Sequence, residues 1–378
     1  MENTQTKPNK KIEVSMVEEL LKDPSKVVVV QTAPSVRVAL GEMFGLKPGT
    51  KVTGKMVASL RKLGFKHVFD TDFGADITVW EEAMEFLKRL KGEGGPLPQF
   101  NSCCIGWLAT AQRNYADLMS HVSTVKSPIG CLGSIAKTYF AEKMHINPNS
   151  IVVVAVVPCI LKKNENALPY NKTNYLFDVD YCWTTKDLGS LIQEKGIDFL
   201  NLPDEEFDDP LGESTSSGTI FGRSGGVLEA VLRCAIYWDS HRVYNDPINF
   251  TPSTIAPDIL EASIKIAGQE VKVCHTGMIG VRKLTEMVRN NTCPYAFIEV
   301  MACPGGCIMG AGQPMHLPAE GIPPLEVRKA RIQGLNDIAD TQERHVSALN
   351  QSIMKVYNEM FDGVAGSEKA EANLHRKY

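Results

Sequence analysis

The chain has 378 residues, and its 40 Lys and Arg side chains against 44 Asp and Glu give a formal net charge of −4. Hydrophobic residues make up 43% and charged residues 22% of the sequence, as in ordinary globular proteins. This balance excludes a disordered chain and gives no electrostatic reason to expect nucleic-acid binding.

The most strongly apolar stretch, residues 151–157, stops at a proline, whereas a membrane-spanning helix needs about twenty apolar residues. Residues 1–11 are polar and contain lysines, so they lack the apolar centre of a secretory signal. We therefore expect a cytoplasmic protein with no signal peptide or transmembrane segment. In a reducing compartment the ten cysteines are better interpreted as metal ligands, reactive thiols or small buried side chains than as disulfides.

The expected elements begin after a loose polar lead-in over residues 1–26. A β-branched run at residues 26–31 predicts a buried strand, and a helical stretch follows over residues 36–44. Similar runs at residues 151–157 and 296–300 predict two more buried strands. Uniformly apolar strands are typical of parallel sheets covered on both faces.

Helical periodicity over residues 78–90 and 134–144 separates these strands and indicates an α/β architecture. In such folds ligands gather beyond the carboxyl ends of strands. Each predicted strand runs into a loop of unusual composition, and two of these loops contain cysteine. Helices from about residue 327 to 361, followed by a polar tail, predict an appendage packed on the core.

Three segments carry a cysteine constellation: residues 100–107, 157–165 and 299–314. The third holds Cys303 and Cys307, spaced C-x3-C around a Gly-Gly pair that would let the backbone approach a cluster closely. Iron–sulfur cubanes are typically held by four thiolates, whereas structural zinc usually takes paired C-x2–4-C knuckles. From spacing alone, an iron–sulfur site, a zinc site and plain buried thiols all stay open.

These three segments resemble the three signature motifs of the iron-only ([FeFe]) hydrogenases, the enzymes that interconvert protons and dihydrogen. The resemblance extends from about Val27 to the C terminus, where the tail is similar to that family's small-subunit segment. Further matching segments are QTAPSVR at 31–37, FGAD at 73–76 and FGRSGG at 221–226.

The resemblance implies two lobes with parallel-rich sheets, flanked by helices, around a buried iron–sulfur active site. A catalytic domain would cover residues 27–317, and a helical small-subunit-like segment residues 318–378. The implied cofactor is the H cluster, a [4Fe–4S] cubane bridged to a di-iron subcluster that bears CO, cyanide and azadithiolate ligands. By motif position the cubane ligands are Cys104, Cys159, Cys303 and Cys307, and Cys307 also bridges to the di-iron unit.

The resemblance also implies residues that hold the di-iron unit through weaker contacts. Lys162 would contact a cyanide, and a cation against a cyanide-bearing anion is physically favourable. Without the motif, Lys162 would be interpreted as a solvated surface lysine. The same role is implied for Ser35 with the adjacent backbone, and the full cofactor-binding set is Lys162, Ser35, Pro34, Ala33, Met301 and Phe221.

A proton route is implied as well. Cys103 would be the proton donor, and a thiol suits transfer in both directions; taken alone, it would be a buried inert thiol. The family's route uses two glutamates, a serine and an arginine, which match Glu82, Glu85, Ser123 and Arg89. Their helical spacing alone would indicate a solvated face with salt bridges. We expect the proton to pass from Cys103 through Glu85, then Ser123, then Glu82 towards solvent.

Four residues depart from the family's motifs: Ile105 replaces a proline, Val157 a methionine, Ile129 a glutamine and Ala311 a glycine. Polarity and packing beside a cluster tune its potential and gas access. We therefore expect these departures to affect catalytic bias, overpotential and oxygen sensitivity, and not the reaction itself.

No ferredoxin-like cysteine run precedes Val27, so we expect a minimal catalytic unit that receives electrons directly at the cubane. The expected partners are an external donor or acceptor such as a ferredoxin, and the maturation proteins that insert the di-iron unit. A hydrogen sensor and a non-catalytic iron–sulfur assembly protein are the alternatives. Cys103 counts against the sensor, and Lys162 with the complete segment 303–314 counts against the assembly protein.

Overall fold

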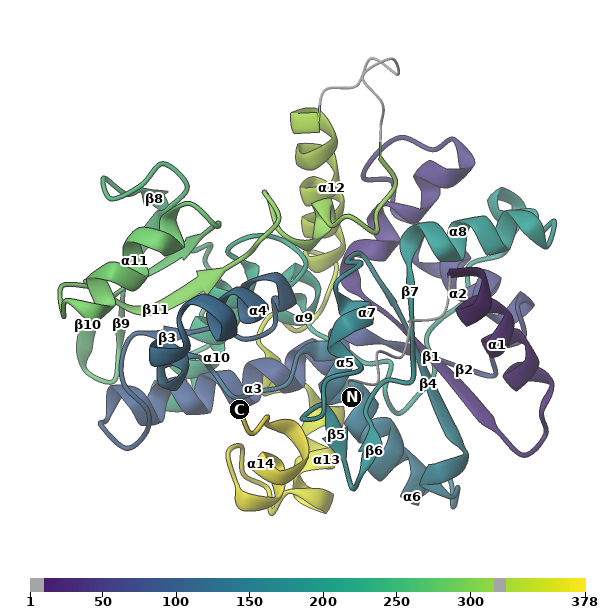
Figure 1. The fold of residues 1–378 in the computed structure, drawn as a ribbon, viewed down its shortest axis with the longest axis horizontal. Coiled ribbons are helices and arrows are strands. Elements are labelled where there is room, and N and C mark those ends of the chain that lie inside the picture. Colours follow the sequence, from purple (N-terminus) through teal and green to yellow (C-terminus); the bar gives the residue numbers. More distant parts are fainter. Residues whose placement is uncertain (1–9, 316–323) are drawn as a thin grey trace, which may run out of the picture.

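The computed structural model describes residues 10–315 and 324–378. Two β-sheets lie on opposite sides of the molecule, and the long helix α3 (Thr71–Leu90) runs between them (Figure 1). This arrangement confirms the predicted α/β fold with two lobes.

The first sheet is entirely parallel. Its order is β2-β1-β4-β7, from strands β1 (Val27–Thr32), β2 (His67–Asp70), β4 (Ile151–Val157) and β7 (Tyr181–Thr184). Every residue of β4 is buried, as expected for an apolar strand covered on both faces. The runs at residues 26–31 and 151–157 are buried parallel strands, as the sequence predicted, and the structure places them next to each other.

The second sheet is mixed. Its order is β3-β11-β10-β9-β8, and the strands are β3 (Gln99–Phe100), β8 (Thr251–Pro252), β9 (Leu260–Ile266), β10 (Gln269–Thr276) and β11 (Tyr295–Val300). Strands β3, β11 and β10 are parallel, whereas β9 and β8 continue the sheet in antiparallel pairing. Strands β9 and β10 were not predicted from the sequence, because neither is a uniformly apolar run. Only the last residue of β9 is buried, and β10 mixes buried and exposed residues.

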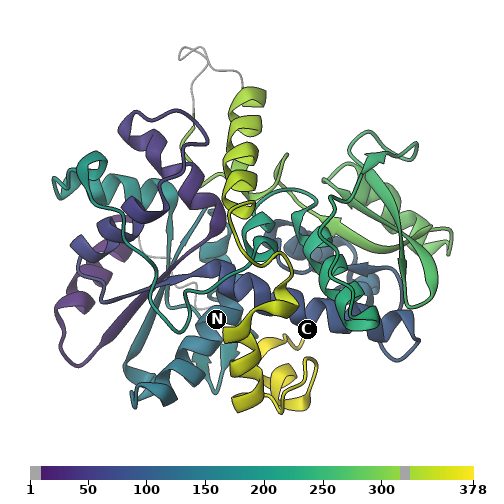
Figure 2. The same ribbon diagram turned by 180° about the vertical axis from the view of Figure 1, so that it is seen from behind.

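Helices cover both sheets and fill the space between them (Figures 1 and 2). Besides α3 they are α1 (Lys10–Lys22), α2 (Thr53–Lys62), α4 (Ile105–Asn114), α5 (Pro128–Ile135), α6 (Ala141–Lys143), α7 (Lys162–Glu165), α8 (Thr185–Glu194), α9 (Ser216–Ile220), α10 (Gly226–Ser240), α11 (Gly280–Arg289), α12 (Pro324–Ala339), α13 (Gln351–Met360) and α14 (Glu368–Leu374). A small hairpin joins β5 (Lys172–Thr173) to β6 (Leu176–Phe177). No described helix is long and apolar enough to cross a membrane.

Two local predictions are wrong. The loose lead-in is helix α1 from Lys10 onwards, and its Val17 is fully buried in the main core. The helix expected over residues 36–44 is two short 3-10 helices, Pro34–Val38 and Leu40–Phe44. The helix expected over residues 134–144 is confirmed, although it begins earlier, at Pro128, and contains a π-helical turn at Ala136–Phe140 between α5 and α6.

The C-terminal segment is helical, as predicted, but it does not end as a polar tail. After α14 the chain pairs with Val125 through His375, and Arg376 is buried. The C terminus thereby returns to the middle of the molecule beside α3 (Figures 1 and 2). Sequence reasoning missed this because a charged residue is buried only when partners from other elements neutralise it. The predicted boundary between residues 317 and 318 lies outside the described residues.

Candidate active site between the two sheets

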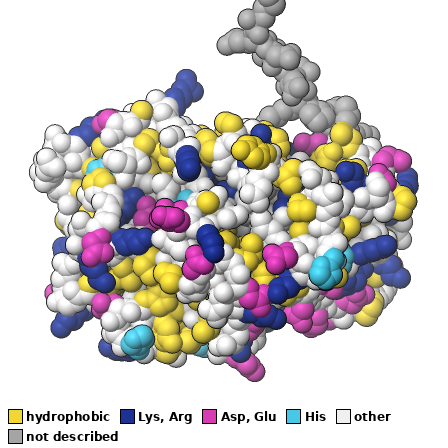
Figure 3. Space-filling model, turned by 90° about the horizontal axis from the view of Figure 1, so that it is seen from below, with side chains coloured by type: hydrophobic (Ala, Val, Ile, Leu, Met, Phe, Trp, Pro, Cys, Tyr) yellow, Lys and Arg dark blue, Asp and Glu magenta, His cyan; other side chains and the backbone are white. Residues whose placement is uncertain are grey.

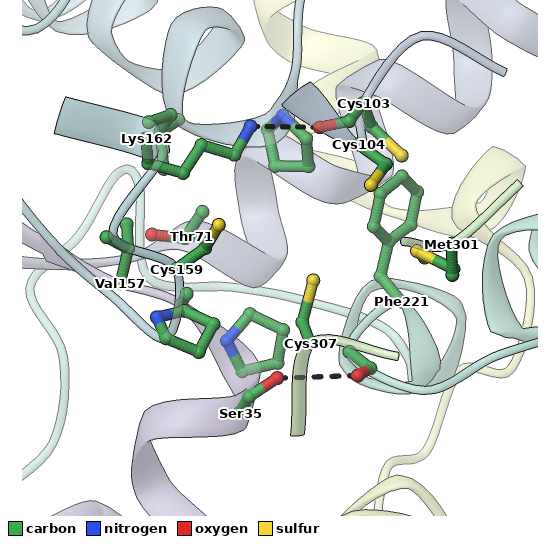
Figure 4. Close-up of a pocket in the computed structure, with 16 residues that line it drawn as sticks. Ser35, Thr71, Cys103, Cys104, Val157, Cys159, Lys162, Phe221, Met301 and Cys307 are labelled. Atoms are coloured by element: carbon green, nitrogen blue, oxygen red, sulfur yellow. Dashed lines mark hydrogen bonds between the residues drawn. The ribbon is translucent and has the colours of Figure 1, made fainter. Parts of the chain in front are cut away.

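The carboxyl ends of strands from both sheets converge on one cavity. In the first sheet, β1 leads into Ala33–Ser35, β2 into Thr71, and β4 into Pro158–Cys159. In the second sheet, β3 leads towards Cys103 and Cys104, and β11 leads into Met301. All of these residues line the cavity, which has about 520 Å³ of empty space and mainly apolar walls (Figure 4).

The predicted residues meet at this cavity. Cys103, Cys104, Cys159 and Cys307 line it together with all six residues of the predicted cofactor-binding set. Among the departures from the motifs, Ile129 and Val157 line it too. The lining residues that the sequence did not single out are Thr71, Pro128, Pro158 and Gly222.

The fourth predicted ligand, Cys303, is partly buried and is not among the residues that line the cavity. Burial raises the pKa of its thiol to about 11, and the neighbouring Cys159 and Cys104 thiolates add to the rise. Burial also raises the pKa of Cys307, and Cys104, Cys159 and Cys303 each raise it further. Four sulfur atoms that interact electrostatically in a buried place need a strongly cationic centre before they can all be thiolates.

The four predicted ligands come from three distant segments of the chain. Among residues 10–315 and 324–378, no group of three His, Cys, Asp or Glu side chains is arranged to hold a single metal ion. Iron–sulfur cubanes are typically held by four thiolates, the number that these cysteines could supply.

The third motif folds tightly against the other loops, and its glycines make this possible. Gly306 has a φ of +95°, and a Cβ there would lie 2.6 Å from the Ser224 nitrogen. A Cβ on Gly310 would lie 2.3 Å from the Pro158 carbonyl oxygen. The glycine-rich segment 221–226 therefore packs beside the third motif.

Lys162 is buried at the cavity and is not a solvated surface lysine. Its Nζ donates to the Cys103 carbonyl at 2.9 Å (Figure 4) and pairs with Glu165 Oε2 at 2.5 Å. Burial alone would lower the pKa of Lys162, but the Glu165 carboxylate outweighs it and the pKa is raised. A permanent cation therefore faces the cavity.

The Ser35 loop is fixed from two sides. Its hydroxyl donates to the Gly222 carbonyl at 3.5 Å, and its own carbonyl accepts from Gln313 Nε2 at 2.9 Å. The glutamine of the third motif thus joins that motif to the loop after β1. The loop is held in place by the protein itself, which suits a preorganised binding wall.

Cys103 is 6% exposed and accepts a hydrogen bond from Asn101 Nδ2 at 3.3 Å. The buried Glu82 lies nearby, because its Oε1 accepts from the Ser102 backbone N–H at 3.3 Å. Burial, followed by the Glu85 charge, raises the pKa of Glu82 to about 8. Its second carboxylate oxygen has no hydrogen-bond partner among the described residues.

The outer part of the predicted route lies at the surface. Glu85 accepts from Ser123 Oγ at 2.7 Å and from Arg89 Nη2 at 2.6 Å. It lines a surface hollow with about 1,100 Å³ of empty space, whereas Glu82 is fully buried. The order expected from the sequence is therefore wrong, since Glu82 is the inner carboxyl group and Glu85 the outer one. The helical spacing placed both glutamates on one face but could not show which end of that face is buried.

Comparison with known proteins decides the family. The sequence profile described as "Iron only hydrogenase large subunit, C-terminal domain" matches residues 26–311. The chain belongs to the iron-only hydrogenase family. A second profile, "Iron hydrogenase small subunit", matches residues 325–378.

Individual relatives agree with this membership. The periplasmic [Fe] hydrogenase large subunit of Nitratidesulfovibrio vulgaris is 45% identical, covering 80% of this chain and 72% of the relative. The NADP-reducing hydrogenase subunit HndD of Solidesulfovibrio fructosivorans is 44% identical, covering 96% of this chain and 62% of the relative. This iron-only hydrogenase family member thus spans between three fifths and three quarters of those two proteins.

The family also reaches beyond hydrogenases. Cytosolic iron-sulfur assembly component 3 of Bos taurus is 30% identical, covering 94% of this chain and 75% of the relative. Among solved structures, the [FeFe] hydrogenase HydA1 of Chlamydomonas reinhardtii, in a variant form, has a TM-score of 0.85 at 32% identity, covering 97% of this chain and 98% of the other. Another [FeFe]-hydrogenase structure, from work on oxygen inactivation through degradation of the H cluster 2Fe subcluster, has a TM-score of 0.86 at 31% identity. The match covers 97% of this chain and 98% of the other.

Proposed function

We propose that this chain is a catalytic [FeFe] hydrogenase, which reversibly reduces protons to dihydrogen. The observation that carries the proposal is the single apolar cavity at which Cys103, three of the four predicted cubane ligands and the Lys162 cation meet. A buried thiol, a cluster-binding thiol set and a fixed cation are what proton reduction at an anionic iron centre requires.

The residues present fit the family's H cluster. Cys104, Cys159, Cys303 and Cys307 would hold the cubane, and Cys307 faces the cavity where the di-iron unit would lie (Figure 4). Lys162, Ser35, Met301 and Phe221 would hold that unit, with Pro34 and Ala33 completing the wall. When bound, the H cluster would supply a path for electrons from an external donor and an open iron site at which protons and dihydrogen interconvert.

The chain's own groups would move the proton. Cys103 would exchange it with the cavity, and the next buried acid is Glu82, whose pKa of about 8 lies near the working pH of an acid–base catalyst. Ser123 would link Glu82 to Glu85 through its hydroxyl, which already donates to Glu85 at 2.7 Å. Arg89 would hold Glu85 in place at the surface hollow.

Electrons would come from outside the chain. We propose an external donor or acceptor such as a ferredoxin, and maturation proteins that deliver the di-iron unit. Assembly in steps is described for one similar [FeFe]-hydrogenase structure, which supports the second part. The cytoplasm stays our proposal for the compartment, although the relative from N. vulgaris is described as periplasmic.

An iron–sulfur assembly role is the second candidate, because the relative from Bos taurus carries that description. The chain is nevertheless more similar to the hydrogenases, at 45% and 44% identity against 30%. Lys162 lines the cavity together with Met301 and Cys307 of the third motif, which favours a bound di-iron unit. A hydrogen sensor would keep the cavity but show little turnover.

The deciding experiment is dihydrogen evolution from reduced viologen. The protein would be loaded with cubane and a synthetic di-iron complex under anaerobic conditions. We expect vigorous gas production, with infrared bands that show bound CO and cyanide. Bands without gas would support the sensor, and a protein that takes up cubane but no di-iron complex would support the assembly role.

A further inference from the structure

The buried C-terminal residue Arg376 reaches the back of the Lys162 site. Its backbone N–H donates to the Thr124 carbonyl at 2.6 Å, so the segment after α14 is pinned to the chain just beyond Ser123. Its guanidinium is 2% exposed and pairs with Glu165 at 2.8 Å. The same group donates to the Ser102 carbonyl at 3.2 Å, one residue before Cys103.

Glu165 is shared between two cations. One of its carboxylate oxygens pairs with Lys162 at 2.5 Å, and the other accepts from Arg376 at 2.8 Å. Ser127 also donates to the second oxygen. Asn171 closes the arrangement, because its Oδ1 accepts from Arg376 Nε at 3.0 Å and its Nδ2 donates to the Glu165 carbonyl at 2.6 Å.

The charges in this group do not cancel. Lys162 and Glu165 alone would form a neutral pair, and a neutral pair would attract an anion in the cavity only weakly. Arg376 adds a second positive charge, so the three side chains together carry a formal charge of +1 in a buried place. Electrostatic interactions there are screened much less than at the surface. The net formal charge of this three-residue group therefore depends on a residue from the end of the chain.

We propose that Arg376 is a positioning residue of this site, which holds Glu165 so that Lys162 presents an uncompensated positive charge to a cyanide-bearing di-iron unit. The inference rests on the proposed function, since it assumes that this unit binds in the cavity. It assigns the C-terminal segment an electrostatic role at the active site in addition to packing.

Charge-changing variants test this role. With the cubane loaded, a synthetic di-iron complex bearing CO and cyanide is titrated into each protein, and infrared spectroscopy follows both its uptake and its cyanide stretching bands. Removing one buried charge by Arg376→Met should weaken uptake about tenfold and shift the cyanide bands in one direction. Glu165→Gln raises the formal charge to +2 and should shift the bands in the opposite direction.

The double variant Glu165→Gln/Arg376→Met restores the formal charge of +1, so its bands and uptake should return close to those of the unmodified protein. Arg376→Lys, which keeps the charge, should also lie close to it. Lys377→Met removes an exposed positive charge from the next residue and serves as the matched control, with no expected shift. A merely structural role for Arg376 predicts no rescue in the double variant, and that outcome would overturn the proposal.

Two further outcomes keep the test decisive. If Arg376→Met does not fold, two comparisons with the unmodified protein carry the test: the cyanide bands of Glu165→Gln should be shifted, and those of Arg376→Lys should be unchanged. A Glu165→Gln protein with unshifted bands overturns the proposal. Unmodified protein that takes up the complex but evolves no dihydrogen contradicts the proposed function and leaves the band comparison valid. Unmodified protein that takes up no di-iron complex overturns both.

Discussion

The Ser123 hydroxyl donates a hydrogen bond to Glu85 Oε2 at 2.7 Å, and this contact orients the whole proposed proton route. Glu85 faces a surface hollow, so Ser123 stands between solvent and the buried Glu82. We therefore propose that the route runs from Cys103 through Glu82, Ser123 and Glu85. Arg89 fixes its outer end by bonding both Glu85 and the Pro96 carbonyl.

This order predicts a difference in chemical rescue. Glu82→Ala and Glu85→Ala should each lower dihydrogen evolution by about a hundredfold, as expected for a lost proton carrier. A small buffer acid such as formic acid should restore much of the Glu85→Ala activity, because that side chain borders the hollow, and little of the Glu82→Ala activity. Evolution rates against buffer concentration measure the effect, and Glu93→Gln in the same hollow is the control. Equal rescue of both variants would contradict the order.

The raised pKa of Glu82 also predicts a pH-dependent stability. Burial raises the pKa of the Glu82 carboxyl from an ordinary 4.5 to about 8. Between pH 4.5 and pH 8 the folded protein therefore binds more protons than the unfolded chain. The free energy of unfolding should then fall as pH rises through this window, by up to about 1.4 kcal/mol per pH unit from this group. Denaturant unfolding at pH 5.5 and 7.5 measures the slope. Glu82→Gln should flatten it, and an unchanged slope would show that Glu82 is not the group responsible.

Replacing Cys103 should have a different effect from replacing other buried cysteines. Cys103→Ala should lower turnover by about a hundredfold or more, since a positioned proton donor contributes on that scale. The cubane should still assemble, because the four predicted ligands are untouched, and iron content with infrared bands checks this. Cys182→Ala removes another buried thiol away from the cavity and should keep most activity. A fully active Cys103→Ala protein would contradict the proposal that Cys103 is the proton donor.

Much of this site could be predicted because the second and third cysteine segments each follow a strand that the sequence makes recognisable, β4 and β11. The first segment follows β3, which has only two residues and was not predicted. The β-branched runs before Ala33 and Pro158 form neighbouring parallel strands, so their loops had to meet at one edge. The burial of Lys162 could be expected only from the family resemblance, because its partners Glu165 and the Cys103 carbonyl come together through folding.

Other features lie beyond local sequence signals. Arg376 occupies a charged segment that the sequence suggests is a solvated tail. Its burial is explained by partners on two distant segments, Ser102 on one and Glu165 with Asn171 on the other. The order of Glu82 and Glu85 depends on which end of α3 the second sheet covers, because Gln99 on β3 packs over Glu82 and donates to its carbonyl at 3.2 Å. On the face that α13 and α14 occupy, acidic and basic side chains are interspersed, so surface charge gives no hint of the buried route (Figure 3).

The glycine-rich third motif predicts a steric requirement. Gly310→Ala would place a Cβ 2.3 Å from the Pro158 carbonyl oxygen, so the loop that carries Cys159 would have to move. We expect a loss of about 1–3 kcal/mol in stability, typical of overpacking, together with incomplete cubane loading. Iron content and thermal unfolding measure both. Gly94→Ala, whose Cβ would meet its nearest neighbour at 3.4 Å, should leave both unchanged; normal loading of Gly310→Ala would contradict the proposed cluster geometry.

Ile105 stands where the family's motif has a proline, and we expect the substitution Ile105→Pro to be tolerated. Ile105 is the first residue of α4, a position at which the backbone N–H has no partner within the helix and the fixed φ of proline suits the turn. Ile105→Pro should therefore cost less than about 1.5 kcal/mol, mostly from lost packing of a side chain that is 6% exposed.

Leu108→Pro, one turn later, is the matched comparison, because the Leu108 N–H donates to the Cys104 carbonyl at 2.9 Å. It should cost about 3 kcal/mol or more. Denaturant unfolding of the cubane-loaded proteins gives both values. A similar cost for the two variants would mean that Ile105 has changed the backbone beside the cluster. The expected difference in cost would instead mean that this departure changes only the side chain at position 105. Helix α4 and the predicted ligand Cys104 would then keep their places.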